Sequence, residues 1–176
     1  SLLERDSTIA EAYQGKGFAL INLERYEEAL PAFVDALRLD PADAASFRGR
    51  SAVFFHLGRY GEALGSVEKA IQLDANCADA YTGKADTLTK LQRYEDALQA
   101  YEQAISLNPD EPKNYRGKAF AHERLAEQAD LKARQLFAER FTLLHTLKEH
   151  SSAVLTLALS KDGQKLFSGS EGGTIK

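Results

Sequence analysis

Aromatic, glycine and basic residues recur at a fixed interval along most of the chain. An aromatic residue, followed by any residue, a glycine and a base, begins at Tyr13, Phe47, Tyr81 and Tyr115. Each of these aromatic residues lies 34 residues after the one before it. An interval of this length is typical of repeat proteins, in which one small structural unit is copied along the chain. The sequence therefore predicts a row of similar units.

Each unit is expected to contain two helices. Tyr26, Ala29, Phe33 and Ala36 in the second half of the first unit are three or four residues apart, which is the spacing of one helix face. The polar segment before each such helix is only a few residues long, which requires neighbouring helices to be antiparallel. Small residues such as Ala29 would let the helix axes approach closely, with larger aromatic side chains beside them. The pattern predicts an all-α chain of antiparallel helix pairs.

One proline does not fit this pattern. Pro31 lies several residues inside the predicted second helix of the first unit. A proline inside a helix removes a backbone N–H donor and costs about 3 kcal/mol. We therefore expect this helix to start late or to bend at Pro31.

The spacing and residue types resemble those of the tetratricopeptide repeat, from about residue 2 to residue 145. The resemblance implies a right-handed α-solenoid, in which stacked helix pairs form a superhelix with a concave groove. It also implies that the chain is part of a longer array. The predicted divisions are the last turn and exit of a preceding repeat within 1–9, repeats at 10–43, 44–77 and 78–111, and a divergent repeat with capping helices at 112–145.

The pattern changes near Phe141 from helical spacing to alternation. Residues 154–159 and 165–169 alternate around a predicted turn at 161–163, which indicates a β-hairpin. The segment from about 142 to 176 resembles the opening of a WD-repeat β-propeller, although the family's Trp-Asp pair is absent. The resemblance predicts a truncated WD-repeat fragment at 146–176, as a hairpin or as a disordered segment.

Composition and charge restrict the class of protein. Hydrophobic residues make up 44% of the chain and charged residues 27%, as in ordinary globular proteins. A net charge of −4 gives no general attraction to nucleic acid, and no apolar run reaches the roughly 18 residues of a membrane span. The single cysteine, Cys77, excludes an internal disulfide and suggests a reducing compartment, so we expect a cytoplasmic location.

No pattern of residues indicates catalysis. We find no nucleophile with a neighbouring base, no pair of acids, no metal-ligand spacing and no phosphate-binding loop. The four histidines lie at no zinc-like spacing with Cys77, which we interpret as an ordinary thiol in a turn between units. The sequence therefore predicts that the chain is not an enzyme, with no catalytic residue, cofactor or metal.

The resemblance places the first helix of each unit along the concave groove. Large apolar side chains on such a face either bind a partner or pack between units, and the basic side chains there are either contacts or solvated. The predicted partner-binding residues are Gln14, Phe18, Arg48, Phe55, Asp86, Lys90, Arg116, Phe120 and Arg124.

Some tetratricopeptide proteins hold the C-terminal carboxylate of a chaperone with lysine and asparagine side chains in this groove. The corresponding positions here hold Gln14, Phe18, Gly49, Asp79 and Gly83. The required asparagine is missing there and in the register one unit later. This mode of binding is therefore not expected.

The leading functional hypothesis is a protein–protein interaction scaffold that binds a peptide or protein in the groove. It would belong to a larger, bacterial-type protein with tetratricopeptide and WD repeats, with no nucleic-acid or membrane partner. One alternative is a regulatory segment of a multidomain signalling enzyme, such as a protein kinase, whose catalytic domain lies outside this sequence. Another is self-association through the ends of the solenoid or through the C-terminal hairpin.

Overall fold

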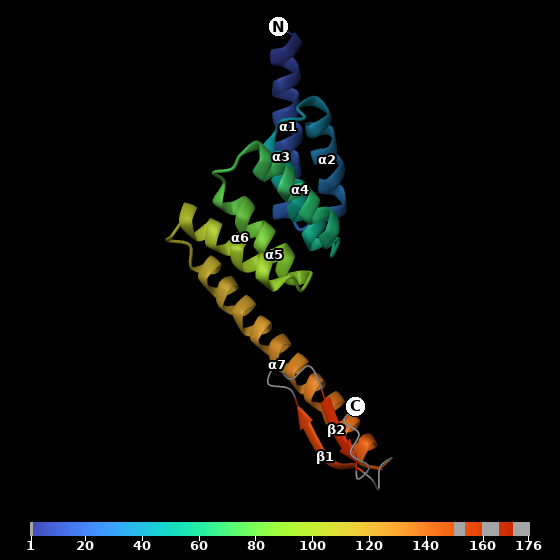
Figure 1. Cartoon of the computed structure of the whole chain (residues 1–176). Coiled ribbons are helices and arrows are strands. Elements are labelled where there is room, and N and C mark those ends of the chain that lie inside the picture. The colour runs from blue at the N-terminus through green and yellow to red at the C-terminus, as the bar shows by residue number, and fades with distance from the viewer. Residues whose placement is uncertain (1, 150–153, 160–165, 171–176) are drawn as a thin grey trace. The chain divides into compact units, whose positions relative to one another are not determined.

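The computed structural model describes residues 2–149, 154–159 and 166–170, and side chains from residue 8 to residue 143. The chain forms two compact units, residues 1–126 and residues 127–176, and each is described by itself. The elements in chain order (Figure 1) are α1 (Leu2–Asn22), α2 (Tyr26–Leu39), α3 (Ala44–His56), α4 (Tyr60–Leu73), α5 (Ala78–Lys90), α6 (Tyr94–Leu107), α7 (Pro112–Glu149), β1 (Val154–Leu159) and β2 (Leu166–Ser170).

The first unit is a stack of helix pairs. Helix α1 packs on α2, α3 on α4, and α5 on α6, and consecutive pairs contact each other through α2 with α3 and α4 with α5. The first helices of consecutive pairs also touch, α1 with α3 and α3 with α5. Figure 1 shows the successive pairs side by side. The predicted all-α stack of repeated helix pairs is therefore confirmed for this unit.

A residue in the left-handed backbone conformation follows the first helix of each pair. Glu24, Gly58 and Gln92 have positive φ angles of 57°, 74° and 59°, and they lie 34 residues apart. One residue in this conformation can end a helix and turn the chain, so that only a short loop is needed before the next helix. The same backbone geometry, repeated at the same interval, gives each pair its antiparallel arrangement.

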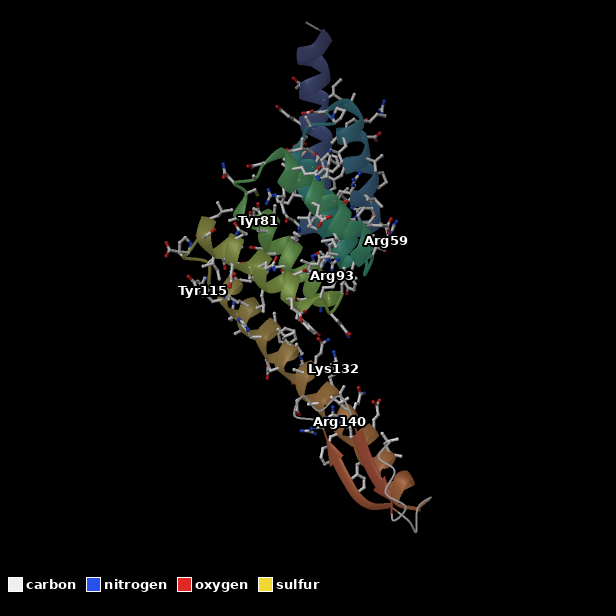
Figure 2. All side chains as sticks on the ribbon, viewed as in Figure 1. Arg59, Tyr81, Arg93, Tyr115, Lys132 and Arg140 are labelled. Carbon is white, nitrogen blue, oxygen red and sulfur yellow. The ribbon has the colours of Figure 1, made fainter. Side chains whose placement is uncertain are left out.

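An arginine follows each of these turns. Arg25 and Arg93 form ion pairs of 2.5 and 2.6 Å with acidic residues three positions later, and Arg59 pairs with Glu62 in the same way. Arg59 and Arg93 are labelled in Figure 2, before α4 and α6. These pairs are exposed, so each adds little stability, but they place negative charge in the first turn of each second helix, where it is favoured.

Alternating small and large side chains form the core of the stack. Ala29, Ala63 and Ala97 on the second helices are completely buried. Phe33 is also completely buried, and its ring lies against Gly17 and Gly49, where an added Cβ would overlap it. The glycines therefore allow a phenyl ring to pack between two first helices, as ridges-into-grooves packing requires.

Pro31 does not delay the start of α2. The helix begins at Tyr26, so the predicted late start is wrong, and Pro31 lies exposed in its second turn. Proline removes a single intrahelical hydrogen bond there. Burial of Ala29 and Phe33 on the opposite side of the same turns offsets this loss, because each apolar side chain contributes stability in proportion to its buried area.

Helix α1 runs without a break from Leu2 to Asn22. The predicted exit from a preceding repeat at residues 2–7 is therefore wrong. Residues 2–12 contain no glycine or proline and are rich in leucine, glutamate and alanine, so nothing in the sequence ends the helix there.

Helix α7 is likewise one continuous helix of 38 residues, Pro112–Glu149, where the sequence predicts more than one capping helix and alternation from Phe141. Both expectations are wrong for residues 112–149. Ala126 occupies the position of Gly58 in the 34-residue repeat, and alanine is the strongest helix former. No glycine or proline occurs between Gly117 and residue 149, so the helix continues past the expected turn.

The second unit contains the C-terminal part of α7 and two antiparallel strands. Strands β1 and β2 pair with Leu157 opposite Ser168 and Leu159 opposite Leu166, and the register is irregular between Val154 and Thr156. The strands lie where the alternating pattern occurs in the sequence. The predicted turn at 161–163 and residues 171–176 lie outside the described residues.

Candidate functional site

A pocket of about 420 Å³ lies on the first helices of the solenoid unit. Its wall is apolar, with Ala52 and Phe55 from α3 and Val67 from α4. Charged side chains surround this wall, and several of them are exposed. The full lining is Arg48, Ser51, Ala52, Phe55, His56, Val67, Asp79, Thr82, Gly83, Asp86, Thr87, Glu111 and Lys113.

The pocket occurs where the repeat has a smaller side chain than usual. In the first and third units, the rings of Phe33 and Tyr101 lie so close to Gly49 and Gly117 that an added Cβ would overlap them. In the second unit the corresponding residue is Val67. A Cβ added at the corresponding Gly83 would lie 3.9 Å from Val67 Cγ2, which is an ordinary contact. The interface is therefore less tightly filled at Val67 and Gly83, which both line the pocket.

Two ion pairs cross the edge of the pocket. Arg48 Nη1 lies 2.9 Å from Asp79 Oδ2, and Lys113 Nζ lies 2.7 Å from Asp86 Oδ2. Each pair joins two consecutive first helices and remains partly exposed to solvent. Exposed pairs of this kind contribute about 0.2–1 kcal/mol, so a charged ligand can rearrange them at small cost.

Asp86 also accepts a hydrogen bond from α6, the second helix of its own pair. The Tyr101 hydroxyl donates a 2.6 Å hydrogen bond to Asp86 Oδ1. Burial, together with the neighbouring Asp86 carboxylate, raises the pKa of Tyr101 well above its usual value, so this hydroxyl keeps its proton. Tyr101 and Lys113 thus hold the Asp86 carboxylate in place.

A polar side chain at one repeat position joins each first helix to the next. Gln14 Nε2 donates to Asp43 Oδ2 at 2.6 Å, and the buried Thr82 hydroxyl donates to Asn114 Oδ1 at 2.7 Å. Arg48, at the same position in the second unit, makes the ion pair described above. These contacts fix the stacking of consecutive units, and the positions therefore have a structural role.

Three of the nine predicted partner-binding residues line the pocket, namely Arg48, Phe55 and Asp86. Gln14 is engaged by Asp43, as described above. Phe18 packs edge-on against Phe33 with ring centroids 5.1 Å apart, and the Arg48 guanidinium lies 5.9 Å from the Phe18 ring centroid. Phe18 is therefore packed against the core of the first helix pair, and a role for it in binding stays a prediction.

The remaining predicted residues lie on α5 and α7 outside the pocket. Lys90 is exposed at the end of α5, and Arg116 is exposed in the first turns of α7. Phe120 is 42% exposed, with the Arg124 guanidinium 4.9 Å from its ring centroid. A role for these four in binding stays a prediction.

Sequence reasoning missed the residues that create the pocket. Val67, Gly83, Glu111 and Lys113 line the pocket but are not among the nine predicted partner-binding residues. One signal was available, because Val67 interrupts the series of aromatic residues at Phe33 and Tyr101. A small residue at a position that is otherwise large leaves space between packed elements.

The described residues also bear on a thiol site, a metal site and a membrane span. Cys77 is the half-buried residue before α5, in the turn between two pairs, where the sequence places it. Within residues 8–143, no three histidine, cysteine or acidic side chains are grouped so that they could hold a metal ion. None of the helices that the structure describes has both the length and the hydropathy of a membrane span.

Family comparisons identify the repeats. Tetratricopeptide repeat models match residues 16–77 and 78–111, which together include α2 to α6 and most of the pocket lining. This part of the chain consists of tetratricopeptide repeats. A model of the WD domain G-beta repeat matches residues 141–176.

Several solved structures have the same fold. The first tetratricopeptide domain of human RPAP3 superposes with a TM-score of 0.68 at 21% identity, covering 70% of this chain and 98% of that one. The Arabidopsis OM64 domain gives 0.66 at 22% identity, with coverage of 67% and 98%. The first domain of Spaghetti (RPAP3), bound to the HSP90 peptide SRMEEVD, gives 0.67 at 22% identity, with coverage of 68% and 95%. No curated protein sequence matches the chain.

Proposed function

We propose that the chain is a protein–protein interaction module that binds an extended segment of a partner across α3, α5 and the start of α7. The observation that supports this most directly is the pocket, because an apolar wall at Phe55 and Val67 is bordered by charged side chains that remain accessible. Apolar contact with a few fixed polar groups is the usual composition of a binding site.

The solved relatives agree with this use of the fold. The domain of Spaghetti (RPAP3) and the second domain of human RPAP3 were solved with peptides of HSP90 and HSP70. At sequence identities near 20%, the likeness indicates a shared fold but does not indicate a shared ligand. Here Phe18, Gly49 and Gly83 stand at positions where a carboxylate clamp needs polar side chains, so we propose a different peptide chemistry for this groove.

We further propose that the segment 141–176 is the beginning of a WD-repeat blade and that the chain belongs to a larger scaffold. The WD-repeat match and the antiparallel pairing of β1 with β2 support this proposal. Two strands alone bury too little surface to be stable, so a blade would require further strands from elsewhere.

The groove is tested by affinity capture of partners followed by titration against Phe55→Ala and Arg48→Ala. Phe47→Ala and Arg38→Ala are matched controls, because both residues lie outside the pocket lining. We expect binding to change at least tenfold in the first two variants, weakening in Phe55→Ala because the apolar wall is lost, and to remain within twofold in the controls. Equal binding by all four variants, with the helical circular dichroism unchanged, would exclude the pocket as the binding site.

A second candidate function is self-association through α7, in the unit formed by residues 127–176. Phe137 and Phe141 are 73% and 61% exposed and stack on one side of the helix, with Leu136 and Leu143 also exposed. Exposed apolar groups of this size often mark an interface. Light scattering of the wild-type chain and of a Phe137→Lys, Phe141→Lys double variant tests this: a dimer that becomes a monomer supports it, and a monomer in both cases excludes it.

A further inference from the structure

We infer that the pocket receives an aromatic side chain of the partner segment and that this side chain is followed or preceded by a lysine or arginine. The inference rests on the proposed function, since it specifies the ligand of the same groove. Two independent features support it: the shape of the repeat interface and the balance of charge around it.

The chain itself shows which side chain fits between its repeats. At the first and third interfaces, the rings of Phe33 and Tyr101 fill the space beside Gly49 and Gly117. At the middle interface Val67 leaves that space open on the side of the pocket, although Gly83 is retained. A ring supplied by a ligand would complete the packing that the other two interfaces already have.

The surroundings of this space suit a ring. Phe55 and Ala52 border it on α3 and are half-buried, and Val67 is almost completely buried. Phe55 already has aromatic neighbours, with the Tyr60 ring 5.6 Å away in an edge-on arrangement. An aromatic ligand side chain can add a further edge-to-face contact of the same kind.

The charge around the pocket is acidic on balance. Asp79, Asp86 and Glu111 face two cations, Arg48 and Lys113, and both cations already have carboxylate partners. The Asp79 side chain is 76% exposed, so it can accept a second cation from a ligand. An acidic ligand would instead have to displace Asp79 or Asp86 from its cation. Charge complementarity therefore favours a basic residue beside the aromatic one.

Amide NMR titrations with small capped peptides test the inference directly. The probes are acetyl-Arg-Phe-amide, acetyl-Arg-Ala-amide and acetyl-Glu-Phe-amide, added to the ¹⁵N-labelled full chain up to millimolar concentration. We expect acetyl-Arg-Phe-amide to shift the amides of Ala52, Phe55 and Gly83. Each of the other two probes is expected to bind at least fivefold more weakly.

Val67→Phe is the decisive variant. It gives the second unit the side chain that the first unit already has, and Gly83 is present to accommodate it as Gly49 accommodates Phe33. Ser51 stands where the first unit has Gly17, so unchanged helical circular dichroism is required to show that the variant folds. Binding of acetyl-Arg-Phe-amide should fall at least tenfold. Asp79→Asn is a second variant that leaves the apolar wall intact, and it should reduce or reverse the preference for the Arg probe over the Glu probe.

Unchanged binding of acetyl-Arg-Phe-amide by Val67→Phe, or tighter binding of acetyl-Glu-Phe-amide by the wild-type chain, would overturn the inference. Its failure can be separated from failure of the proposed function. A captured partner whose binding depends on Phe55 but not on Val67 would overturn only the aromatic anchor. A partner whose binding depends on neither residue would overturn both.

Discussion

Single glycines determine how closely helices of neighbouring repeats approach. Gly49 lies under the ring of Phe33, whereas Gly83 has only Val67 Cγ2 at 3.9 Å from an added Cβ. The two glycines occupy the same position in the repeat, but the partner side chain is Phe33 in one case and Val67 in the other. The same substitution should therefore have different effects at the two sites.

We predict that Gly49→Ala lowers the free energy of unfolding by about 1–3 kcal/mol, because the methyl group overpacks the interface. Gly83→Ala should leave stability unchanged or raise it by up to about 1 kcal/mol, since alanine favours the helix. Urea denaturation followed by circular dichroism measures both. Equal losses in the two variants would contradict the interface geometry.

The left-handed turn residues give a second matched comparison. Gly58 has a φ of 74°, and Gly65 lies exposed inside α4 with no atom near an added Cβ. Gly58→Ala should cost about 1–2 kcal/mol, because alanine disfavours positive φ. Gly65→Ala should stabilise by about 0.5–1 kcal/mol. Thermal unfolding measures the stability of both variants. A change in Tm of the same sign in the two variants would contradict the assigned turn.

The raised pKa of Tyr101 predicts a dependence of stability on alkaline pH. Because the folded state holds this proton more tightly than the unfolded state, the stabilisation is complete below about pH 10, the ordinary pKa of an unfolded tyrosine. It is lost progressively as pH rises from there towards the higher pKa of the folded state. We predict that Tyr101→Phe loses less stability than the wild type between pH 9 and pH 11. Tyr115→Phe, at an exposed position, is the control and should follow the wild type.

At the scale of elements, the 34-residue interval predicted the helix pairs from α2 to α6, because both helices of each unit have regular apolar faces. It did not predict the unbroken α1 and α7. The turn between paired helices depends on one residue in the left-handed backbone conformation. Glu24, Gly58 and Gln92 adopt it, and these residues share their position in the repeat but not their residue type. Ala126 at that position continues the helix, which is a local preference that the apolar pattern does not contain.

Pro31 provides the prediction for α2. Because it lies within the helix and is exposed, Pro31→Ala restores a hydrogen bond without changing the core. The free energy of unfolding should rise by up to about 3 kcal/mol. Pro41→Ala, in the turn after α2, is the control and should not stabilise. Chemical denaturation that shows no gain for Pro31→Ala would mean that the helix is distorted at this residue.

For the molecule as a whole, the repeat pattern indicated the helices that line the pocket but not its position along the stack. Arg48, Phe55 and Asp86 were predicted from their positions and line the pocket. Phe18 and Gln14 occupy similar positions but are engaged by Phe33 and Asp43. The contacts that distinguish these outcomes join residues that are distant in the sequence, so the repeat pattern alone does not reveal them.

Hydrogen exchange of the full chain, with and without a captured partner, tests the central claim most directly. If the groove of the stacked pairs is the binding surface, the partner should slow exchange in α3, in α5 and at the start of α7. A second hollow, lined by residues such as Glu68, Tyr81 and Arg93, provides the alternative site. Protection in α4, α5 and α6, with α3 and the start of α7 unchanged, would contradict the account.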